Sequence, residues 1–465
     1  MFQNRRRHAN YKRLILCSDG TWLSSDDGDK SVPSNVSKLA RAISKTGLDR
    51  EGRLVKQIVY YQSGLGSKDL LVQKSLYGAI GLGLDEEVFQ LYDFISNNYE
   101  PGDELFFFGF SRGAFTVRSA AGLVSDVGVF PAVHMQRLPE MWRAYRQNRW
   151  GVSFRNSTWY LDNKEQLGLR DVTIKVIGVW DTVGALGIPD WPLVALANKI
   201  GIGINQQYAF HNTRLSGFVE HAFQALAIDE QRLPFTPTLW HQTENGTTSL
   251  QQCWFPGVHT NIGGQAEFFR SLGDHEEIGD NTLAWMMDNL SEMLTFDLDT
   301  IRFIIAKHKR ALNRIDNSVE RLSNGWGCGP IVSNFFGLQG FFFWLLGKQD
   351  RTPGNYPRDS GDGTAGATNE YFHPMVRIRK LKLSCRYNPE ALQGYVLVEP
   401  HGDVGWTWAK SDKAVPEYML RRRPMSVAFM EHERLQFGST ESLSRILCPR
   451  DILEGLDSAN RMVGR

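Results

Sequence analysis

The sequence predicts an α/β fold in which a mostly parallel sheet carries helices on both faces. Short β-rich apolar runs alternate with helical patterns through about the first 300 residues, which is typical of stacked βαβ units. Each of these runs ends in Gly, Ser, Asp or His. Hydrophobic residues make up 42% and charged residues 22% of the 465 positions, so a sizeable folded core is expected.

Five runs are expected to form strands, namely residues 14–18, 56–61, 105–110, 174–180 and 252–255. Polar residues or glycines follow them closely in each case: Asp19 and Gly20, Gly64 and Gly66, Ser111, Asp181, and His259. In open parallel sheets the ligand crevice lies outside the carboxyl ends of the strands. Chemistry is therefore expected at these residues.

A helix is expected after residue 111, because Ala114, Val117, Ala121 and Val124 recur at helical spacing. Residues 183–218 are apolar and punctuated by glycine, and they form either a cap over the crevice or an additional packed helix pair. The pattern changes beyond residue 310. We therefore expect a main domain over residues 12–310 and a C-terminal extension over 311–465, with strand-like runs at 375–383 and 394–399.

Composition excludes several classes of protein and site. A formal net charge of +1 removes the general electrostatic argument for binding nucleic acid. The five cysteines are widely spaced and form no C-x-x-C pair, so neither a disulfide framework nor a thiolate zinc site is expected. The basic N-terminus lacks the apolar stretch of a signal peptide, which predicts a cytoplasmic protein.

The most apolar stretch is residues 335–347, but its 13 residues are fewer than the about 20 that a membrane-spanning helix needs. We interpret it as a buried or partner-facing helix. Peripheral insertion into a membrane is the alternative.

The segment Gly109-Phe110-Ser111-Arg112-Gly113 matches the G-x-S-x-G pattern, and it has an apolar strand before it and an amphipathic helix after it. In this arrangement the serine occupies a strained turn that lifts its hydroxyl away from the sheet. The following helix offers backbone N–H groups to a developing oxyanion. Ser111 is therefore the predicted nucleophile.

A serine at neutral pH needs a base, and the base needs a third group that orients it. His259 is the preferred base because it follows a strand-like run and precedes a flexible Gly263-Gly264 turn. Asp181, at the end of its strand, is the leading candidate for the acid, and Asp229 is the alternative. Serine, acid, base is the chain order of α/β-hydrolases. His275, His308 and His373 also fit this order, but none of them follows a strand directly.

The oxyanion would be held by the N–H of Arg112 and by a second donor from another strand end. Gly20 and Thr21 are the preferred source, because a glycine lets the backbone approach closely. The segment 64–66 is the alternative source. Asp19 is a further candidate for orienting the site through hydrogen bonds. No metal or cofactor is needed for this chemistry.

Five segments together resemble a known family: residues 19–22, 109–114, 180–183, 225–230 and 254–259. The family is that of uncharacterised α/β-hydrolases grouped with the catalytic domain of type VI secretion phospholipase effectors, and the resemblance covers about residues 12 to 310. It implies a serine esterase fold with Ser111, His259 and Asp181 as the triad, and characterised relatives hydrolyse phospholipid acyl esters. The family usually reads His-Ser-Asp where this chain reads His259-Thr260-Asn261.

The expected function is a serine hydrolase of acyl esters, with a small-molecule or lipid ester as substrate. Thioesters and amides share the same triad chemistry. The rival hypothesis is a catalytically silent hydrolase fold that acts as a binding or scaffold protein, for which Asn261 is the supporting residue. The oligomeric state is not predicted by the sequence.

Overall fold

The structure is a computed structural model. It describes residues 7–20, 32–64, 84–148, 152–183, 215–242, 246–264, 276–318, 325–331, 335, 344, 347–356, 366–381, 386–401, 405–411, 413–421 and 442–463.

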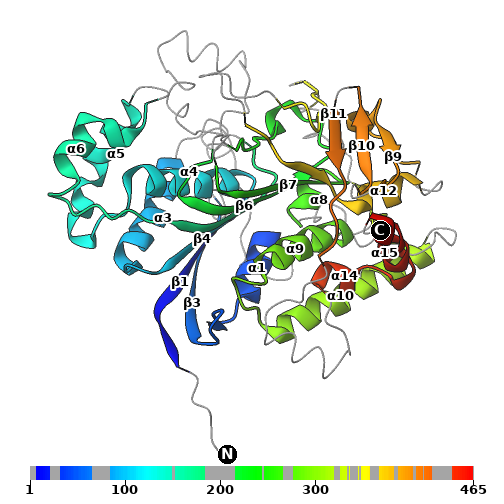
Figure 1. The fold of residues 1–465 in the computed structure, drawn as a ribbon, viewed down its shortest axis with the longest axis horizontal. Coiled ribbons are helices and arrows are strands. Elements are labelled where there is room, and N and C mark those ends of the chain that lie inside the picture. Colours follow the sequence, from blue (N-terminus) through cyan, green and yellow to red (C-terminus); the bar gives the residue numbers. More distant parts are fainter. Residues whose placement is uncertain are drawn as a thin grey trace, which may run out of the picture.

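A mostly parallel sheet lies at the centre of the molecule, and Figure 1 shows helices packed on both sides of it. Its eight strands follow the order β2-β3-β1-β4-β5-β6-β7-β8, and only β2 runs antiparallel to its neighbour. The strands are β1 (His8–Ser18), β2 (Thr46–Leu48), β3 (Leu54–Gln62), β4 (Glu104–Phe110), β5 (Ile174–Trp180), β6 (Val219–Ala227), β7 (Ser249–Phe255) and β8 (Glu370–Phe372). The predicted α/β fold with a mostly parallel sheet is thus confirmed.

Successive side chains of the central strands enter opposite layers, as the pleat of a strand requires. On β1, Leu14 and Leu16 belong to an apolar cluster that also contains residues of α3 (Leu84–Asn98), α4 (Arg112–Val127), α5 (Leu138–Arg146) and α6 (Thr158–Asn163). Ile15 and Cys17 face the other layer, which contains α1 (Asn35–Ala42), α9 (Glu277–Leu290), α10 (Leu298–Ser318), α14 (Leu443–Leu447) and α15 (Arg450–Val463). Because both sides are covered, the central strands are almost continuously apolar.

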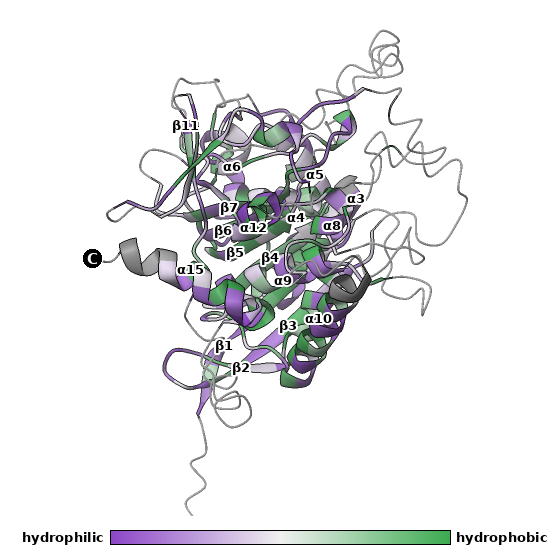
Figure 2. Ribbon diagram, turned by 90° about the vertical axis from the view of Figure 1, so that its right-hand side faces the viewer, coloured by the Kyte–Doolittle hydropathy of each residue, from purple (hydrophilic) through white to green (hydrophobic). Residues whose placement is uncertain are grey.

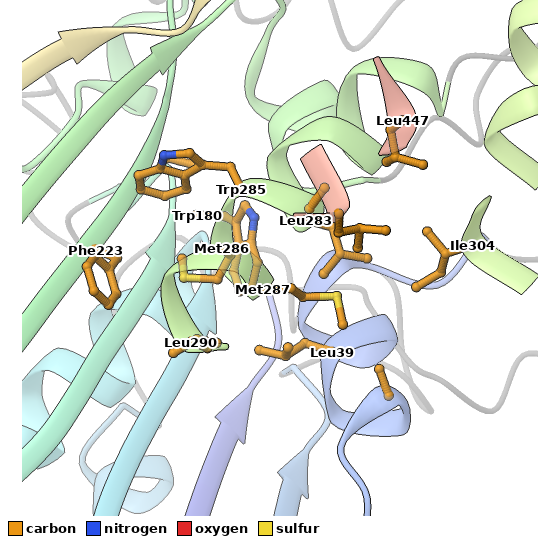
Figure 3. Close-up of a cluster of buried hydrophobic side chains, with 14 of the residues drawn as sticks. Leu39, Trp180, Phe223, Leu283, Trp285, Met286, Met287, Leu290, Ile304 and Leu447 are labelled. Atoms are coloured by element: carbon orange, nitrogen blue, oxygen red, sulfur yellow. The ribbon is translucent and has the colours of Figure 1, made fainter. Parts of the chain in front are cut away.

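The second layer is dominated by large apolar side chains from segments far apart in sequence. Figure 3 shows Trp180 and Phe223 of the sheet beside Trp285 and Met286 of α9, with Leu447 of α14 at the far side of the cluster. Helix α9 is buried along its whole length. Figure 2 shows both hydrophobic and hydrophilic residues on α10 and on the coloured part of α15, and apolar residues of both helices join this layer.

Residues beyond 310 add to both the sheet and its surroundings. Strand β8 pairs in parallel with β7, so the extension supplies the last strand of the main sheet. A separate antiparallel sheet consists of β9 (Val396–Val398), β10 (Thr407–Lys410) and β11 (Lys413–Pro416). It packs against β7 and β8 through a third apolar cluster that includes Trp254, Phe372 and Trp408. The other helices of the described residues are α8 (His259–Ile262), α12 (Pro374–Leu381) and the 3-10 turns Ala132–Arg137, Phe154–Asn156, Leu233–Phe235 and Glu390–Leu392.

Two details differ from the prediction. Residues 374–381 form helix α12 instead of a strand, because their alternation of apolar and basic residues does not reflect one buried and one exposed face. Arg377 and Arg379 are themselves buried: Arg377 pairs with Glu417, and Arg379 donates to the carbonyls of Gly327 and Gly329. The structure also contains β6, which was not predicted.

The predicted cap lies mostly outside the described residues, as does most of the 335–347 run. Among the helices that the structure describes, none has both the length and the apolar composition to cross a membrane.

Candidate active site

Ser111 lies in the turn between β4 and α4 in a conformation that is unusual for a side-chain-bearing residue. Its φ of 57° and ψ of −122° fall outside the regions that non-glycine residues ordinarily occupy. Its N–H donates to the carbonyl of Trp180, at the end of the adjacent β5, over 3.2 Å. The Ser111 side chain does not cap helix α4. The serine is therefore held in a strained strand-to-helix turn without its hydroxyl being used for capping.

The two glycines of the motif allow this turn to be as tight as it is. A Cβ added to Gly109 would lie 2.5 Å from the carbonyl oxygen of Gly113. A Cβ added to Gly113 would lie 2.2 Å from the carbonyl oxygen of Ser18 and 2.4 Å from that of Asp19. All three distances are far below van der Waals contact with backbone atoms. The first turn of α4 thus lies close to the end of β4 because Gly109 has no side chain, and close to the end of β1 because Gly113 has none.

His259 and Asp181 form a buried pair at the ends of two other strands. His259 begins α8 just after β7, and Asp181 directly follows β5. Nδ1 of His259 lies 2.7 Å from Oδ2 of Asp181, and both side chains are almost fully buried. An N–H on Nδ1 would donate to the carboxylate and leave Nε2 as the lone-pair nitrogen. This is the tautomer that a general base requires.

Aromatic packing fixes the plane of the imidazole. The ring of Phe110, the residue before Ser111, stacks on the His259 ring with centroids 4.7 Å apart. Phe235 contacts the same imidazole edge-on, with centroids 4.9 Å apart. A Cβ on Gly263 would lie 2.1 Å from the Phe110 ring, so this glycine makes room for it. The imidazole is therefore held beside the Ser111 turn.

The Ser111 hydroxyl and the imidazole are not hydrogen-bonded among the contacts of the described residues. Hydrogen bonds between a nucleophile and its base are often long in the absence of substrate and shorten in the reacting complex. The three groups share one edge of the sheet, at the carboxyl ends of β4, β5 and β7. The arrangement can support nucleophilic acyl transfer if the Ser111 side chain turns toward Nε2.

The Asp181 carboxylate has two further partners. The N–H of Ala227 donates to Oδ1 over 3.1 Å, and Nη2 of Arg351 donates to Oδ2 over 3.1 Å. Burial alone would raise the pKa of Asp181, but the charge of Arg351 and the hydrogen bonds from His259 and Ala227 hold it below its ordinary value. Asp181 is thus an ionised acceptor despite being buried.

A second carboxylate, Glu230, supports the backbone of the histidine. Its Oε2 accepts the N–H of His259 over 3.1 Å, while its two oxygens receive Nε and Nη2 of Arg232, each over 2.9 Å. The Arg232 guanidinium also lies over the ring of Phe235, 3.7 Å from its centroid. Burial would raise the pKa of Glu230, but the charge and hydrogen bonds of Arg232 lower it below the ordinary value. Glu230 therefore connects the backbone N–H of His259 to Arg232, whose guanidinium lies over Phe235, the residue that packs against the His259 ring.

Asp229, the alternative acid, has different partners. Its Oδ2 accepts the N–H of Gly257 over 2.5 Å and the hydroxyl of Tyr387 over 2.9 Å. Burial raises its pKa to about 6, although both hydrogen bonds oppose this. The structure brings Asp181, not Asp229, to Nδ1 of His259. Asp229 instead anchors the loop that leads into the histidine.

The other histidines in the permitted chain order occupy packing positions. His308 is fully buried, with Nδ1 3.7 Å from Oδ2 of Asp280. His373 is also fully buried, and its ring stacks on Phe255 with centroids 4.4 Å apart. His275 lies outside the described residues.

The predicted oxyanion donors are only partly described. The N–H of Arg112 belongs to the first turn of α4, where N–H groups have no acceptor within the helix. Burial lowers the pKa of the Arg112 side chain to about 10, partly offset by the charge of Glu87. The N–H of Gly20 already donates to Oδ1 of Asp19 over 2.8 Å. Service as an oxyanion donor would require that bond to be shared or broken. Thr21, Leu65 and Gly66 lie outside the described residues.

Asp19 is the buried centre of a small network at the end of β1. Its Oδ2 accepts the hydroxyls of Ser34 over 2.5 Å and Tyr61 over 2.7 Å. Ser34 in turn caps α1 by accepting the N–H of Ser37. Burial raises the pKa of Asp19, and its three hydrogen bonds counteract this. Asp19 thus holds the end of β1 in place next to the first turn of α4.

Asn261 is the residue at which the sequence departs from the pattern expected from the resemblance, and both polar atoms of its side chain are hydrogen-bonded. Oδ1 accepts the N–H of Val258 over 3.1 Å, and Nδ2 donates to the carbonyl of Pro330 over 3.2 Å. A carboxylate could accept the first bond but could not donate the second. The amide therefore ties the histidine turn to the C-terminal extension.

Sequence reasoning missed Arg351, Glu230 and Phe235. Arg351 lies 170 positions from Asp181, in a segment without a strand or helix pattern, so no sequence signal connected the two. Glu230 was visible only as the neighbour of Asp229. It becomes significant once β6 is known, because it follows that strand at the same edge of the sheet as Asp181.

Comparison with known families gives a match over more than half of the chain. The family model described as "T6SS, Phospholipase effector Tle1-like, catalytic domain" matches residues 12–289. This range contains Ser111, Asp181 and His259, while Arg351 lies beyond it.

Individual relatives have low sequence identity to this chain. The chain is 28% identical over 249 residues to "Uncharacterized protein YEL023C" of Saccharomyces cerevisiae, and the match covers 49% of this chain and 33% of that protein. The solved structure of the Tle1 effector bound to the VgrG spike from the type 6 secretion system has 18% identity and a TM-score of 0.29, with 56% of this chain and 52% of that chain covered. An uncharacterized protein from Pseudomonas aeruginosa has 16% identity and a TM-score of 0.34, with 61% and 46% covered. The chain thus spans about a third of the yeast protein and about half of the structures that it matches.

Proposed function

Because this chain belongs to the family of Tle1-like phospholipase effector catalytic domains, we propose that it is a serine hydrolase that cleaves carboxylic esters through Ser111, His259 and Asp181. The observation that carries the proposal is the buried 2.7 Å contact between Nδ1 of His259 and Oδ2 of Asp181, beside the strained Ser111 turn. A histidine oriented by a carboxylate next to such a serine is the arrangement that activates a hydroxyl for acyl transfer.

In the proposed reaction, Oγ of Ser111 attacks the ester carbonyl while Nε2 of His259 takes its proton. Asp181 keeps Nδ1 protonated and stabilises the imidazolium that forms. The N–H of Arg112, with the positive end of α4, stabilises the oxyanion. Collapse of the tetrahedral intermediate releases the alcohol, which receives its proton from His259, and leaves Ser111 acylated. Water activated by His259 then hydrolyses the acyl-enzyme.

The proposed substrates are acyl esters of lipids, phospholipids among them. The support for a lipid is the phospholipase named in the description of the family. Thioesters and amides would pass through the same steps, so the bond must be identified by measurement.

The test is labelling of the purified full chain with a fluorophosphonate, which reacts only with an activated serine. Wild-type protein should be labelled, whereas Ser111→Ala and His259→Ala should each lose more than about 90% of the signal, because nucleophile and base act as one unit. Ser153→Ala is the control that should label normally, since Ser153 is exposed and its hydroxyl caps no helix. A panel of acyl esters, thioesters and phospholipids would then identify the substrate. Folded wild-type protein that resists labelling would instead favour a silent binding or scaffold protein.

A further inference from the structure

We propose that Arg351 is a positioning residue for the catalytic acid, so that the C-terminal extension completes the active site. This inference rests on the proposed function, because it assigns Arg351 a role through Asp181. The side chain would not touch the substrate. It would act by fixing the place and charge of the carboxylate that orients His259.

The geometry links three parts of the site through one guanidinium. Nη2 of Arg351 donates to Oδ2 of Asp181 over 3.1 Å and to the carbonyl oxygen of Phe235 over 2.7 Å. Oδ2 is the same atom that faces Nδ1 of His259, and Phe235 is the residue whose ring packs edge-on against that imidazole. Arg351 therefore contacts both the acid and the backbone of the aromatic residue that hold the base.

The backbone around Arg351 is anchored to the catalytic sheet. Leu233 donates its N–H to the carbonyl of Gly347 over 3.2 Å, and Gln349 donates to the carbonyl of Gln231 over 2.9 Å. These bonds join the segment before Arg351 to the loop that follows β6. An antiparallel bridge between Arg232 and Lys348 adds to these bonds, so backbone pairing holds the segment that places Arg351 beside Asp181. Arg351 lies beyond the residues that the family model matches.

The hydrogen bonding of Arg351 is not what stability alone would favour. The residue is 3% exposed, and within the part of the chain that the structure describes the buried Nη1 meets no hydrogen-bond partner. A buried guanidinium with an unsatisfied nitrogen lowers stability relative to an apolar side chain of similar size. The contact to which we attribute the burial of this charge is its ion pair with Asp181.

The charged groups around Asp181 determine what loss of Arg351 would do. His259 faces the carboxylate from α8 and Arg351 faces it from the extension, while Glu230, Arg232 and Tyr356 interact with members of the same group. Among these, the charge of Arg351 is the largest influence that opposes the effect of burial on Asp181. Without it, the pKa of Asp181 would rise, and the carboxyl would stay protonated to higher pH. A protonated Asp181 could not orient His259 in the tautomer that a base requires.

The experiment measures kcat and KM against pH for the wild-type protein and for Arg351→Met, using a water-soluble p-nitrophenyl acyl ester. In Arg351→Met the acid limb of the kcat/KM profile should move up by about one pH unit, because this limb belongs to the coupled pair of Asp181 and His259 and loss of the adjacent guanidinium charge favours the protonated pair. The loss should fall on kcat rather than KM, and Arg351→Lys should move the limb back toward the wild-type position.

A double-mutant cycle separates this role from a structural one. In an Asp181→Asn background, Arg351→Met should change kcat/KM by less than about twofold, because its effect depends on the carboxylate. Arg379→Met is the matched control: Arg379 is also a buried arginine of the extension that donates to backbone carbonyls, so its loss should lower stability without moving the acid limb.

An unchanged acid limb in folded Arg351→Met, or a full additional loss in the Asp181→Asn background, would overturn the inference. If Arg351→Met does not fold, Arg351→Gln takes its place under the same criterion, and unfolding of both would show a purely structural role. Wild-type protein that neither reacts with a fluorophosphonate nor hydrolyses the ester would instead refute the proposed function. The two failures are therefore distinguishable.

Discussion

Backbone strain at the site is concentrated in two residues of the proposed triad. Ser111 has a φ of 57° and Asp181 a φ of 39°, although neither is a glycine. Such conformations cost on the order of 1–3 kcal/mol each and persist only where the surroundings enforce them. Here the enforcing bonds are main-chain ones, from Ser111 to Trp180 and from Asp181 to Ala225. The backbone hydrogen bonds at the sheet edge therefore hold Ser111 and Asp181 in strained conformations, and these conformations turn both side chains away from the strand direction.

Asp229 offers a test of linkage between pH and stability. Its pKa of about 6 lies above the roughly 4 of an unfolded aspartate, so between these values the folded state binds more protons. Stability must therefore fall as pH rises from about 4 to about 6 and then level off. Asp229→Asn cannot ionise, so relative to wild type it should gain about 2 kcal/mol between pH 4 and pH 7.5, measured by urea unfolding.

The exposed Asp162 provides the control for this measurement, because its replacement by asparagine should shift stability equally at both pH values. A gap between Asp229→Asn and wild type that stays constant with pH would contradict the prediction.

At the scale of elements, the sequence predicted the strands that are apolar without interruption. The expected runs 105–110 and 174–180 coincide with β4 and β5 to within one residue, because both faces of these strands are buried. Strand β6 was missed since Glu220, His221 and Gln224 interrupt its apolar pattern. Gln224 is fully buried and hydrogen-bonded to Thr182 and Thr238, a pairing that no local pattern reveals.

The contact between α4 and β1 depends on a single missing side chain. In Gly113→Ala the new Cβ would meet the carbonyl oxygens of Ser18 and Asp19 at 2.2 and 2.4 Å, so helix and strand must separate. We expect a loss of stability of at least about 3 kcal/mol, together with loss of fluorophosphonate labelling. Thermal unfolding followed by circular dichroism would measure the first.

Gly122, in the same helix, is the matched control. A Cβ there meets nothing within 4 Å, so Gly122→Ala should stabilise the protein by about 0.5–1 kcal/mol through helix propensity. Equal changes in stability for Gly113→Ala and Gly122→Ala would show that the close approach of backbone atoms at Gly113 does not make this position sensitive to a side chain.

At the scale of the whole molecule, the site draws on parts of the chain that no local pattern connects. Ser111, Asp181 and His259 could be proposed from the sequence because each follows an apolar strand, and strand ends meet at one edge of a parallel sheet. Arg351 could not, because it reaches Asp181 from a loop whose position depends on tertiary packing. The extension beyond residue 310 also depends on tertiary contacts, because its strand β8 joins the sheet by pairing with β7.

This dependence predicts the outcome of truncation. A chain ending at Ser318, the last residue of α10, would lose β8, Arg351 and α14 together. Trp254 of β7 would lose its hydrogen bond to Glu370, and the α9 surface that packs against Leu443 and Leu447 would be exposed. An unpaired strand edge beside exposed apolar surface favours aggregation. We expect the truncated protein to be insoluble, or to bind a hydrophobic dye and lack near-ultraviolet circular dichroism.

The opposite result would be equally informative. A truncated chain that unfolds cooperatively and keeps its near-ultraviolet signal would show that the main domain folds alone. Its reaction with a fluorophosphonate would then measure the extension's contribution to the site, since the fold would be present without Arg351. Because Asp181 would lose the guanidinium that keeps it ionised while remaining buried, such a chain should label slowly at pH 6 and recover as the pH is raised.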